Sequence, residues 1–185
     1  MKMRFCYAFF LCLFIACNSS PSEHQLDKND LANDTERVIL TKTSEYELTI
    51  ALPDGWNVFT EAERWAAKDD CADEFCANVV WYQSVSSGEL NDSLVQLTIA
   101  ELEKTYGFSL KIISISPIYT NPSQFSIAYA FGRGGHSFVG YAFVVKTQTY
   151  LNLFEVIDEY KKSEEVEPKL NRAVRLCGSV QVELF

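Results

Sequence analysis

Four apolar segments follow one another closely in the second half of the chain, and their spacing is the strongest constraint on the fold. They span residues 110–116, 125–131, 138–145 and 150–157. The links between them are short and contain turn-forming residues such as Pro122, Gly134 and Gly135. Since a parallel crossover needs about a dozen residues or more, links this short join antiparallel neighbours. The sequence therefore predicts an antiparallel meander.

Further strands are expected on both sides of this meander. Tyr46, Leu48 and Ile50 alternate with polar residues, which is typical of a half-buried strand. A turn at residues 53–55 follows, because proline presets one backbone dihedral and glycine accepts a positive one. Shorter or less regular candidates span residues 38–41, 64–68, 77–82 and 180–184.

Two segments have helical periodicity. The first, residues 92–106, ends before Gly107, and its apolar stripe consists of Val95, Ile99, Leu102 and Tyr106. The second, residues 164–177, has Pro168 in its first turn, ends before Gly178, and its expected stripe consists of Val166, Leu170, Val174 and Cys177. The order of strands, helix, meander, helix and strand predicts an α+β fold, with an antiparallel sheet flanked by helices over residues 37–185.

The amino terminus has the pattern of an export signal. Lys2 and Arg4 precede an apolar run, residues 5–15, which is shorter than the roughly 20 residues of a membrane-spanning helix. Ala16 and Cys17 close the run and resemble a bacterial lipobox, although Phe14 stands where an aliphatic residue is usual. The alternative is an ordinary secretory signal with an incidental cysteine.

The lipobox resemblance implies that residues 1–16 are a lipoprotein signal peptide and that Cys17 is the lipid attachment site. Two or three acyl chains would anchor the protein firmly, at about 0.8 kcal/mol per buried methylene. Asn18 follows in place of the aspartate that retains such lipoproteins at the inner membrane, which favours the outer membrane. Residues 17–36, rich in Ser, Asn, Asp and Glu, are expected to form a flexible tether.

A second resemblance concerns the globular part. Residues 52–56, Leu-Pro-Asp-Gly-Trp, follow an amphipathic strand, and residues 75–80, Phe-Cys-Ala-Asn-Val-Val, precede the first helix, the meander and the closing helix and strand. This arrangement, over residues 44–184, resembles the PsbP-like proteins. The resemblance implies an α/β/α sandwich around an antiparallel sheet and a binding or assembly role without catalysis. No binding residue of that family can be matched to this chain.

The charge of the chain argues against polyanionic partners. The net charge is −9, and removal of residues 1–16 with Lys2 and Arg4 leaves 25 acidic against 14 basic residues, a net −11. Such a chain repels nucleic-acid phosphates and anionic lipid headgroups. We therefore expect no nucleic-acid binding and no membrane adhesion through a basic patch.

Three cysteines remain after Cys17, and their pairing is open. Cys71 and Cys76 flank an acidic loop between two expected strands, so a disulfide between them is one candidate. A Cys76–Cys177 link would close a longer loop and stabilise more, by roughly 5 against 2 kcal/mol. Cys177 belongs to the expected buried helix stripe, however, and is interpreted as a core residue.

No set of residues predicts catalysis, a metal or a cofactor. The acidic loop contains four oxygen ligands in an arrangement unlike an EF-hand, at Asp69, Asp70, Asp73 and Glu74. His136 is the one histidine of the globular part, and no G-x-S-x-G elbow is present. Most of the many aromatic residues of the meander are expected in the core, and any on the surface would suit a partner.

The resulting hypothesis is a lipid-anchored, non-enzymatic envelope protein whose single domain binds or assembles with an envelope partner. The alternative is a periplasmic carrier of a small apolar ligand, held in a groove between sheet and helices. An enzyme of unknown type ranks third. No feature of the sequence specifies an oligomeric state or a membrane face.

Overall fold

The computed structural model describes residues 35–61, 64–68, 78–85, 88–120 and 123–185. It contains two α-helices, α2 (Asp92–Tyr106) and α3 (Val166–Gly178), and a 3-10 turn, η1 (Ser163–Glu165). The strands of the first half are β1 (Thr35–Lys42), β2 (Tyr46–Pro53), β3 (Asn57–Glu61), β4 (Arg64–Lys68) and β5 (Asn78–Val85). Those of the second half are β6 (Lys111–Ile115), β7 (Tyr119–Thr120), β8 (Ser123–Arg133), β9 (His136–Lys146), β10 (Tyr150–Tyr160) and β11 (Gln181–Leu184).

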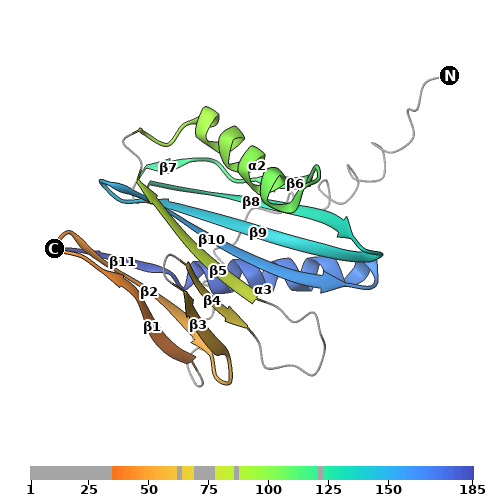
Figure 1. Cartoon of the computed structure of the whole chain (residues 1–185), viewed down its shortest axis with the longest axis horizontal. Coiled ribbons are helices and arrows are strands. Elements are labelled where there is room, and N and C mark those ends of the chain that lie inside the picture. The colour runs from red at the N-terminus through yellow and green to blue at the C-terminus, as the bar shows by residue number, and fades with distance from the viewer. Residues whose placement is uncertain (1–34, 62–63, 69–77, 86–87, 121–122) are drawn as a thin grey trace, which may run out of the picture. The chain divides into compact units, whose positions relative to one another are not determined.

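An eight-stranded antiparallel sheet forms the centre of this part of the chain (Figure 1). Its order is β3-β4-β5-β10-β9-β8-β6, and β7 pairs with β8. The meander predicted from the short links is confirmed, since β8, β9 and β10 are consecutive antiparallel neighbours. The β8–β9 turn requires glycine, because Gly134 and Gly135 have φ values of 61° and 87°, in the left-handed region.

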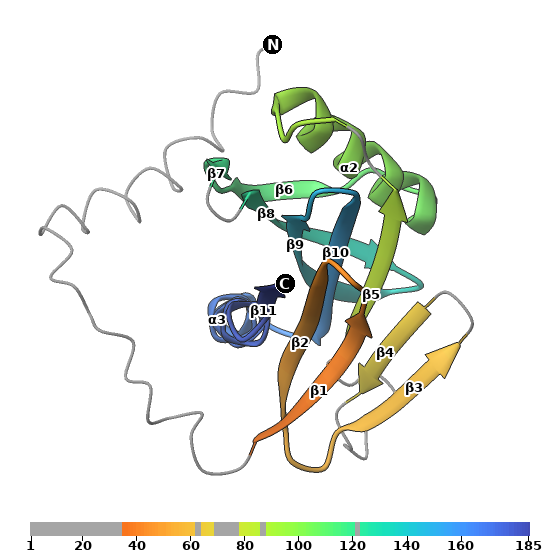
Figure 2. The same cartoon turned by 90° about the vertical axis from the view of Figure 1, so that its left-hand side faces the viewer.

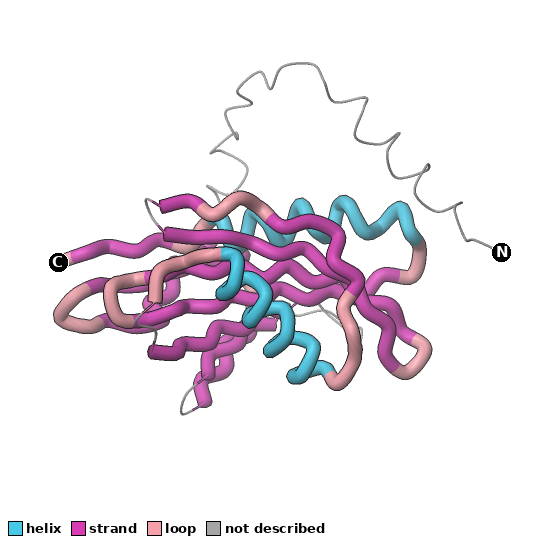
Figure 3. The backbone as a smooth tube through the Cα atoms, turned by 90° about the horizontal axis from the view of Figure 1, so that it is seen from above, coloured by secondary structure: helices cyan, strands magenta, loops and turns pink. Residues whose placement is uncertain are grey.

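The two faces of the main sheet are covered by different layers. Helix α2 lies over one face, and α3 lies on the other (Figures 1 and 2). Figure 3, a view from above, shows α2 lying obliquely across the strands. A second sheet of order β1-β2-β11 shares a core with α3, β4, β5 and β10. The predicted α+β class, with helices flanking an antiparallel sheet, is confirmed, and the three-stranded sheet is an addition that the sequence did not predict.

Strand β2 supplies the core beneath the small sheet. Tyr46, Leu48 and Ile50, the alternating residues, are completely buried. They pack with Trp65 and Phe154 of the main sheet, among other apolar side chains. A polar contact also joins the two sheets, because Gln83 Nε2 of β5 donates to the Tyr46 hydroxyl at 2.5 Å.

Helix α2 covers a second core on the opposite face. Val95 and Leu102 are buried there, and Ile99 and Tyr106 pack against the same cluster, so the predicted stripe is confirmed. The Asn91 side chain caps the helix by accepting from the Leu94 amide at 3.0 Å. Its end is also as predicted, since Gly107 has φ 77° and its amide donates to the Glu103 carbonyl.

Helix α3 corrects one expected core residue. Val174 is 45% exposed, whereas Ala173, Leu176 and Cys177 are buried. Ala173 and Val174 lie three and four residues after Leu170, so both fall near the apolar stripe of the helix. Sequence periodicity alone does not decide which of the two is buried. Packing of the helix against β9 and β10 selects the small Ala173 in place of Val174.

Two strands were not expected from the sequence. Strand β3 pairs with β4, and the two-residue β7 pairs with β8. Strand β1 begins at Thr35, ahead of the domain start expected at Arg37. The predicted signal peptide and Cys17 lie outside the described residues, as does nearly all of the predicted tether.

Gly140 allows Tyr129 to lie across the sheet, and we predict that Gly140→Ala destabilises the fold. A Cβ at position 140 would overlap the Tyr129 ring and lie 2.6 Å from its hydroxyl oxygen. Tyr129 is completely buried, so its ring has little room to move. We expect a loss of about 2–3 kcal/mol in urea unfolding. Gly88→Ala is the control, because a Cβ there meets nothing within 4 Å. Equal stabilities of the two variants would contradict this packing.

Candidate functional site

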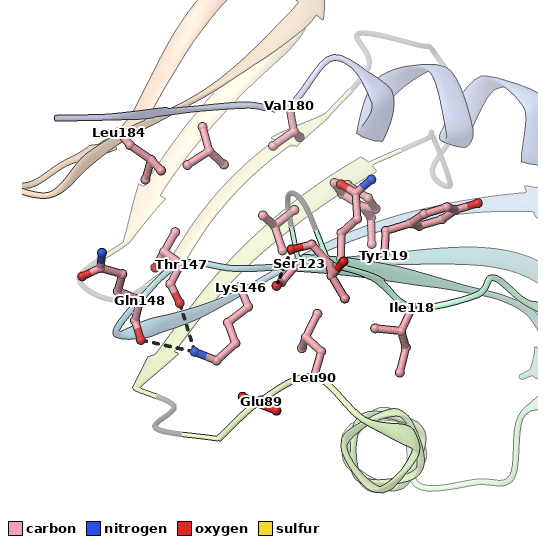
Figure 4. A pocket seen from close by; sticks show the side chains of 15 residues that line it. Glu89, Leu90, Ile118, Tyr119, Ser123, Lys146, Thr147, Gln148, Val180 and Leu184 are labelled. Carbon is pink, nitrogen blue, oxygen red and sulfur yellow. Dashed lines mark hydrogen bonds between the residues drawn. The ribbon is translucent and has the colours of Figure 1, made fainter.

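A groove at one end of the main sheet is the candidate site. It lies where β8 begins and β9 ends, and its volume is about 720 Å³. Both outer layers contribute to it: Figure 4 shows Val180 and Leu184 on one side and Leu90 and Ile118 on the other. The full lining is Glu89, Leu90, Ile118, Tyr119, Thr120, Ser123, Gln124, Phe143, Val145, Lys146, Thr147, Gln148, Val180, Val182 and Leu184.

Strand β11 forms one wall of the groove because of its register. Val182 and Leu184 pair with Leu48 and Tyr46 of β2, two residues that point into the core. Side chains opposite one another on paired strands share a face, so Val182 and Leu184 also point inward. Nevertheless Leu184 is 68% exposed. An inward-facing leucine that stays this exposed marks a place where the layers leave apolar surface uncovered.

Two side chains of β9 lie on the same side of the sheet as this wall. Phe143 and Val145 belong to the face that carries Phe154 and Asn152 of β10, their partners in the ladder. Phe143 packs against the core cluster on the α3 side, whereas Val145 is 2% exposed. Because β9 pairs with β8 on one side and β10 on the other, its backbone groups are used within the sheet. This part of the groove therefore offers side chains and few backbone partners.

Lys146 places a positive charge on the opposite, α2 side of the sheet, because it pairs with Leu151, which packs against the α2 core. This lysine is the last residue of β9, and its ammonium donates to the carbonyls of Thr147 and Gln148 at 3.1 and 3.2 Å, as Figure 4 shows. These two carbonyls hold the charge near the turn between β9 and β10. Glu89 supplies the acidic side chain of the lining. The groove therefore runs round the end of the sheet: its β11 wall on the α3 side is aliphatic, and the Lys146 cation lies on the α2 side, near Leu90 and Glu89.

A separate cluster of polar groups is buried beneath α2. Glu155 of β10 is 1% exposed, and its carboxylate accepts from the Tyr129 hydroxyl of β8. Tyr106, in the last turn of α2, also hydrogen-bonds Glu155. Burial raises the pKa of Glu155 above its ordinary value, against the opposite effect of the two phenol donors. Burial, and next the Glu155 charge, raise the pKa of both tyrosines, so both stay protonated and can donate.

The aromatic residues of the meander divide between the two cores. Tyr129 and Phe131 face α2, and the Phe131 ring stacks on Tyr106 with centroids 4.8 Å apart. Tyr141 and Phe143 pack on the opposite side, against the core shared with α3. The expectation that most of these rings lie in the core is confirmed. The sequence did not predict that Glu155 is the buried hydrogen-bond partner of Tyr106 and Tyr129. It is a single acidic residue within an otherwise mostly apolar strand segment, and no local pattern shows which tyrosines will reach it.

The other residues considered from the sequence do not line the groove. His136 is partly exposed at the start of β9, and its Nδ1 lies 2.7 Å from a Glu159 carboxylate oxygen. Cys177 is a free, buried thiol whose pKa is raised by burial, which confirms its core assignment. Cys71 and Cys76, the candidate disulfide, lie outside the described residues, as does the acidic loop.

The part of the chain that the structure describes shows neither a metal-binding cluster nor a membrane-spanning helix. No cluster of three or more His, Cys, Asp or Glu side chains there is arranged to hold a metal ion. Within those same residues, neither helix has the length and apolar character needed to cross a bilayer.

Comparison with known proteins identifies a shared fold. No family model and no curated protein matches the chain. The chain is similar to LpqN, which is involved in cell envelope biogenesis of Mycobacterium tuberculosis, with a TM-score of 0.52 at 10% identity over 81% of this chain and 92% of LpqN. At that identity the similarity shows the fold alone.

Two further solved structures are less similar to this chain. A Pseudomonas aeruginosa protein of unknown function, a putative regulator, has a TM-score of 0.45 at 12% identity over 77% of this chain and 94% of its own. A Bacteroides thetaiotaomicron protein has a TM-score of 0.42 at 11% identity over 74% of this chain and 45% of its own.

The buried carboxyl predicts a pH dependence of stability that Glu155→Gln removes. A folded pKa raised above the ordinary 4.5 means that the folded state binds the proton more tightly than the unfolded state. The stability that protonated Glu155 contributes is therefore complete below about pH 4.5 and is lost as the pH rises through the folded pKa. We expect the unfolding free energy of the wild type, minus that of the variant, to fall as urea titrations move from pH 4 to pH 8.

A matched acid on the surface controls for the loss of one charge. Glu101 lies on α2, and its side chain is 71% exposed. The difference between wild type and Glu101→Gln should change little over the same pH range. A Glu155→Gln difference that stays constant or rises with pH would contradict the assignment.

Proposed function

We propose that this chain is a lipid-anchored, non-enzymatic protein of the bacterial cell envelope whose single domain is a binding module. The observation that carries the proposal is the groove, where aliphatic side chains of β11 remain uncovered at the end of the main sheet. The fold shared with LpqN, a protein involved in cell envelope biogenesis, supports an envelope role. The lipobox resemblance at Cys17 supports the anchor.

The proposed location is the outer membrane, where acyl chains on Cys17 would hold the domain. Asn18 after the cysteine supports this choice over retention at the inner membrane. The PsbP-like pattern of residues 44–184 supports a binding or assembly role for the domain, with an envelope protein as its partner.

A carrier of a small apolar ligand is the second candidate, and the groove lining favours it. Val180, Val182 and Leu184 are aliphatic, and the volume of about 720 Å³ falls in the usual range of small-molecule sites, roughly 300–1,000 Å³. In this case the anchored domain would hold a ligand rather than a partner protein.

Replacement of Cys17 tests the anchor. In cells, the wild-type chain should fractionate with membranes and incorporate labelled fatty acid. Cys17→Ser should lose the label and move to the soluble envelope fraction, since the acyl chains provide the membrane affinity. Cys12→Ser, which changes a cysteine inside the apolar run, is the control and should keep the label. Membrane association with unchanged acyl mass in Cys17→Ser would refute the proposal.

A photo-crosslinker at position 184 distinguishes the two candidates in cells. The side chain is exposed and lines the groove, so its replacement should leave the fold intact. A defined protein adduct would support the binding module with a protein partner, whereas an adduct of lipid mass would support the carrier. Adducts at position 97, on an exposed leucine outside the groove lining, measure random encounters.

A further inference from the structure

Strand β11 is an edge of the three-stranded sheet, and its side away from β2 is open. Among the elements that the structure describes, β2 is the one that lies along it. The Phe185 amide donates to the Glu45 carbonyl at 3.0 Å, one position beyond the Leu184–Tyr46 pair. Because hydrogen-bonded and non-hydrogen-bonded pairs alternate along an antiparallel ladder, the N–H and C=O groups of Val182 and Leu184 point away from β2, toward the open edge.

The groove lies beside this edge and gives it an apolar floor. Val180 and Leu184 extend from β11 into the groove, as Figure 4 shows. Phe143 and Val145 of β9 line it from the same side of the main sheet. A strand added to β11 would continue the small sheet across the groove, and every second side chain would point toward these residues. Such a strand would cover the exposed leucine and pair the open backbone groups at the same time.

The outer face of the small sheet indicates which residue such a strand needs between its apolar positions. Lys42 of β1, Glu47 of β2 and Glu183 of β11 form one row across the ladder. The Lys42 ammonium lies 2.6 Å from a Glu47 carboxylate oxygen. Glu183 is exposed at the end of the row, and its neighbour Glu47 has the same charge. Opposite charges on directly paired residues stabilise a sheet, so a basic residue on the open side of Glu183 would complete the row.

We propose that β11 binds an extended segment of a partner protein as an added antiparallel strand. Apolar side chains of the segment enter the groove opposite Val182 and Leu184, and a lysine or arginine between them lies opposite Glu183. Recognition of this kind combines main-chain hydrogen bonds with space for alternate side chains, which the edge and the groove supply. The inference rests on the binding module of the proposed function and specifies the partner by an apolar-basic-apolar succession.

The open backbone groups favour a polypeptide over a small apolar ligand. A buried N–H or C=O group without a partner raises the free energy of the complex. An apolar molecule that covered the edge at Val182 and Leu184 would bury these groups without satisfying them. An extended polypeptide brings its own donors and acceptors at the spacing of a ladder, so it covers the same surface with its hydrogen bonds made.

The other sheet edges are less suited to an added strand. The registers of β1 and β6 with their neighbours shift between Ile39 and Thr41 and between Ile112 and Ser114. Such irregularities interrupt an edge and reduce its ability to pair. Strand β3 pairs regularly with β4, but its residues do not line the groove. Strand β11 combines a regular register with the groove.

A labelled peptide tests the edge directly. The probe is fluorescein-labelled Ser-Thr-Val-Lys-Val-Thr-Ser, titrated by fluorescence anisotropy into the full chain carrying Cys17→Ser, so that no acyl group is attached. We expect saturable binding. N-methylation of the first valine removes an N–H group that faces β11 and should weaken binding about tenfold, because a carbonyl of β11 loses its donor. N-methylation of the lysine, whose N–H group points away from β11, is the matched control and should keep the affinity. Equal effects, or no saturable binding, would overturn the inference.

Reversal of the charge at position 183 tests the register. Glu183→Lys should weaken the probe about fivefold and strengthen, by a similar factor, a peptide with glutamate in place of the lysine. A gain for one peptide is not explained by a loss of fold. Glu101→Lys makes the same change of charge on the exposed surface of α2 and should leave the preference between the two peptides unchanged. An unchanged preference in Glu183→Lys would overturn the inference.

Substitution of the groove wall tests where the apolar side chains lie. Leu184→Asn should weaken the probe about fivefold, since the valine side chains of the peptide would lose an apolar contact without any change of charge. Leu97→Asn is the matched control, because Leu97 is also exposed, at 61%, but lies outside the groove lining. Equal affinities of the two variants for the probe would contradict the proposed position.

Crosslinking in cells supplies the remaining outcomes. Mass spectrometry of a protein adduct at position 184 should map the crosslink to an apolar-basic-apolar segment of the partner. Adducts that contain only lipid, only a second copy of this chain, or a segment without this pattern would overturn the inference. If a defined partner is captured but the peptide does not bind, this inference fails while the proposed binding module stands. The proposed anchor is tested separately, by fractionation of Cys17→Ser.

Discussion

The meander of β8, β9 and β10 imposes the main constraint on this structure, because both of its faces are apolar. Each of the three strands has eleven residues, and each buries side chains on both faces. A sheet with two apolar faces is stable in water only when a layer covers each of them. Helix α2 covers one face, while α3 and the three-stranded sheet cover the other. The rest of the fold follows from this requirement.

The candidate site follows from the place where this cover ends. Helix α3 finishes at Gly178, and the short β11 continues with Val182 and Leu184 facing inward. These side chains extend past the surface that the main sheet can bury, so apolar area stays open on the α3 side of the groove. Function is therefore proposed at the boundary of the core, where scaffold residues stop contacting one another and become available to a ligand.

The Glu155 cluster shows how a polar group is accommodated inside the α2 layer. A buried carboxyl is costly unless donors reach it, and Tyr106 and Tyr129 provide them from two different elements. Gly140 leaves the space across which the Tyr129 ring extends. Since Tyr106 belongs to α2, the cluster also defines where the end of this helix sits on the sheet. An entirely apolar contact would specify that position less sharply.

The sequence alone determined the elements whose signals are local. The meander followed from short links, and α2 from an apolar stripe that ends at Gly107, because turns and caps depend on neighbouring residues. Strand β3 was not predicted. It has only five residues, and its pairing with β4 cannot be inferred from the periodicity of its own sequence.

Tertiary structure decided the features that depend on contacts between distant segments. It placed β1, β2 and β11 in a separate sheet and selected Ala173 over Val174 for the core. It also brought Lys146 and Leu184 to one groove. The physical reason is that burial is a property of packed layers. A sequence pattern shows which face of an element is apolar, whereas only the assembled layers determine which apolar side chains remain uncovered.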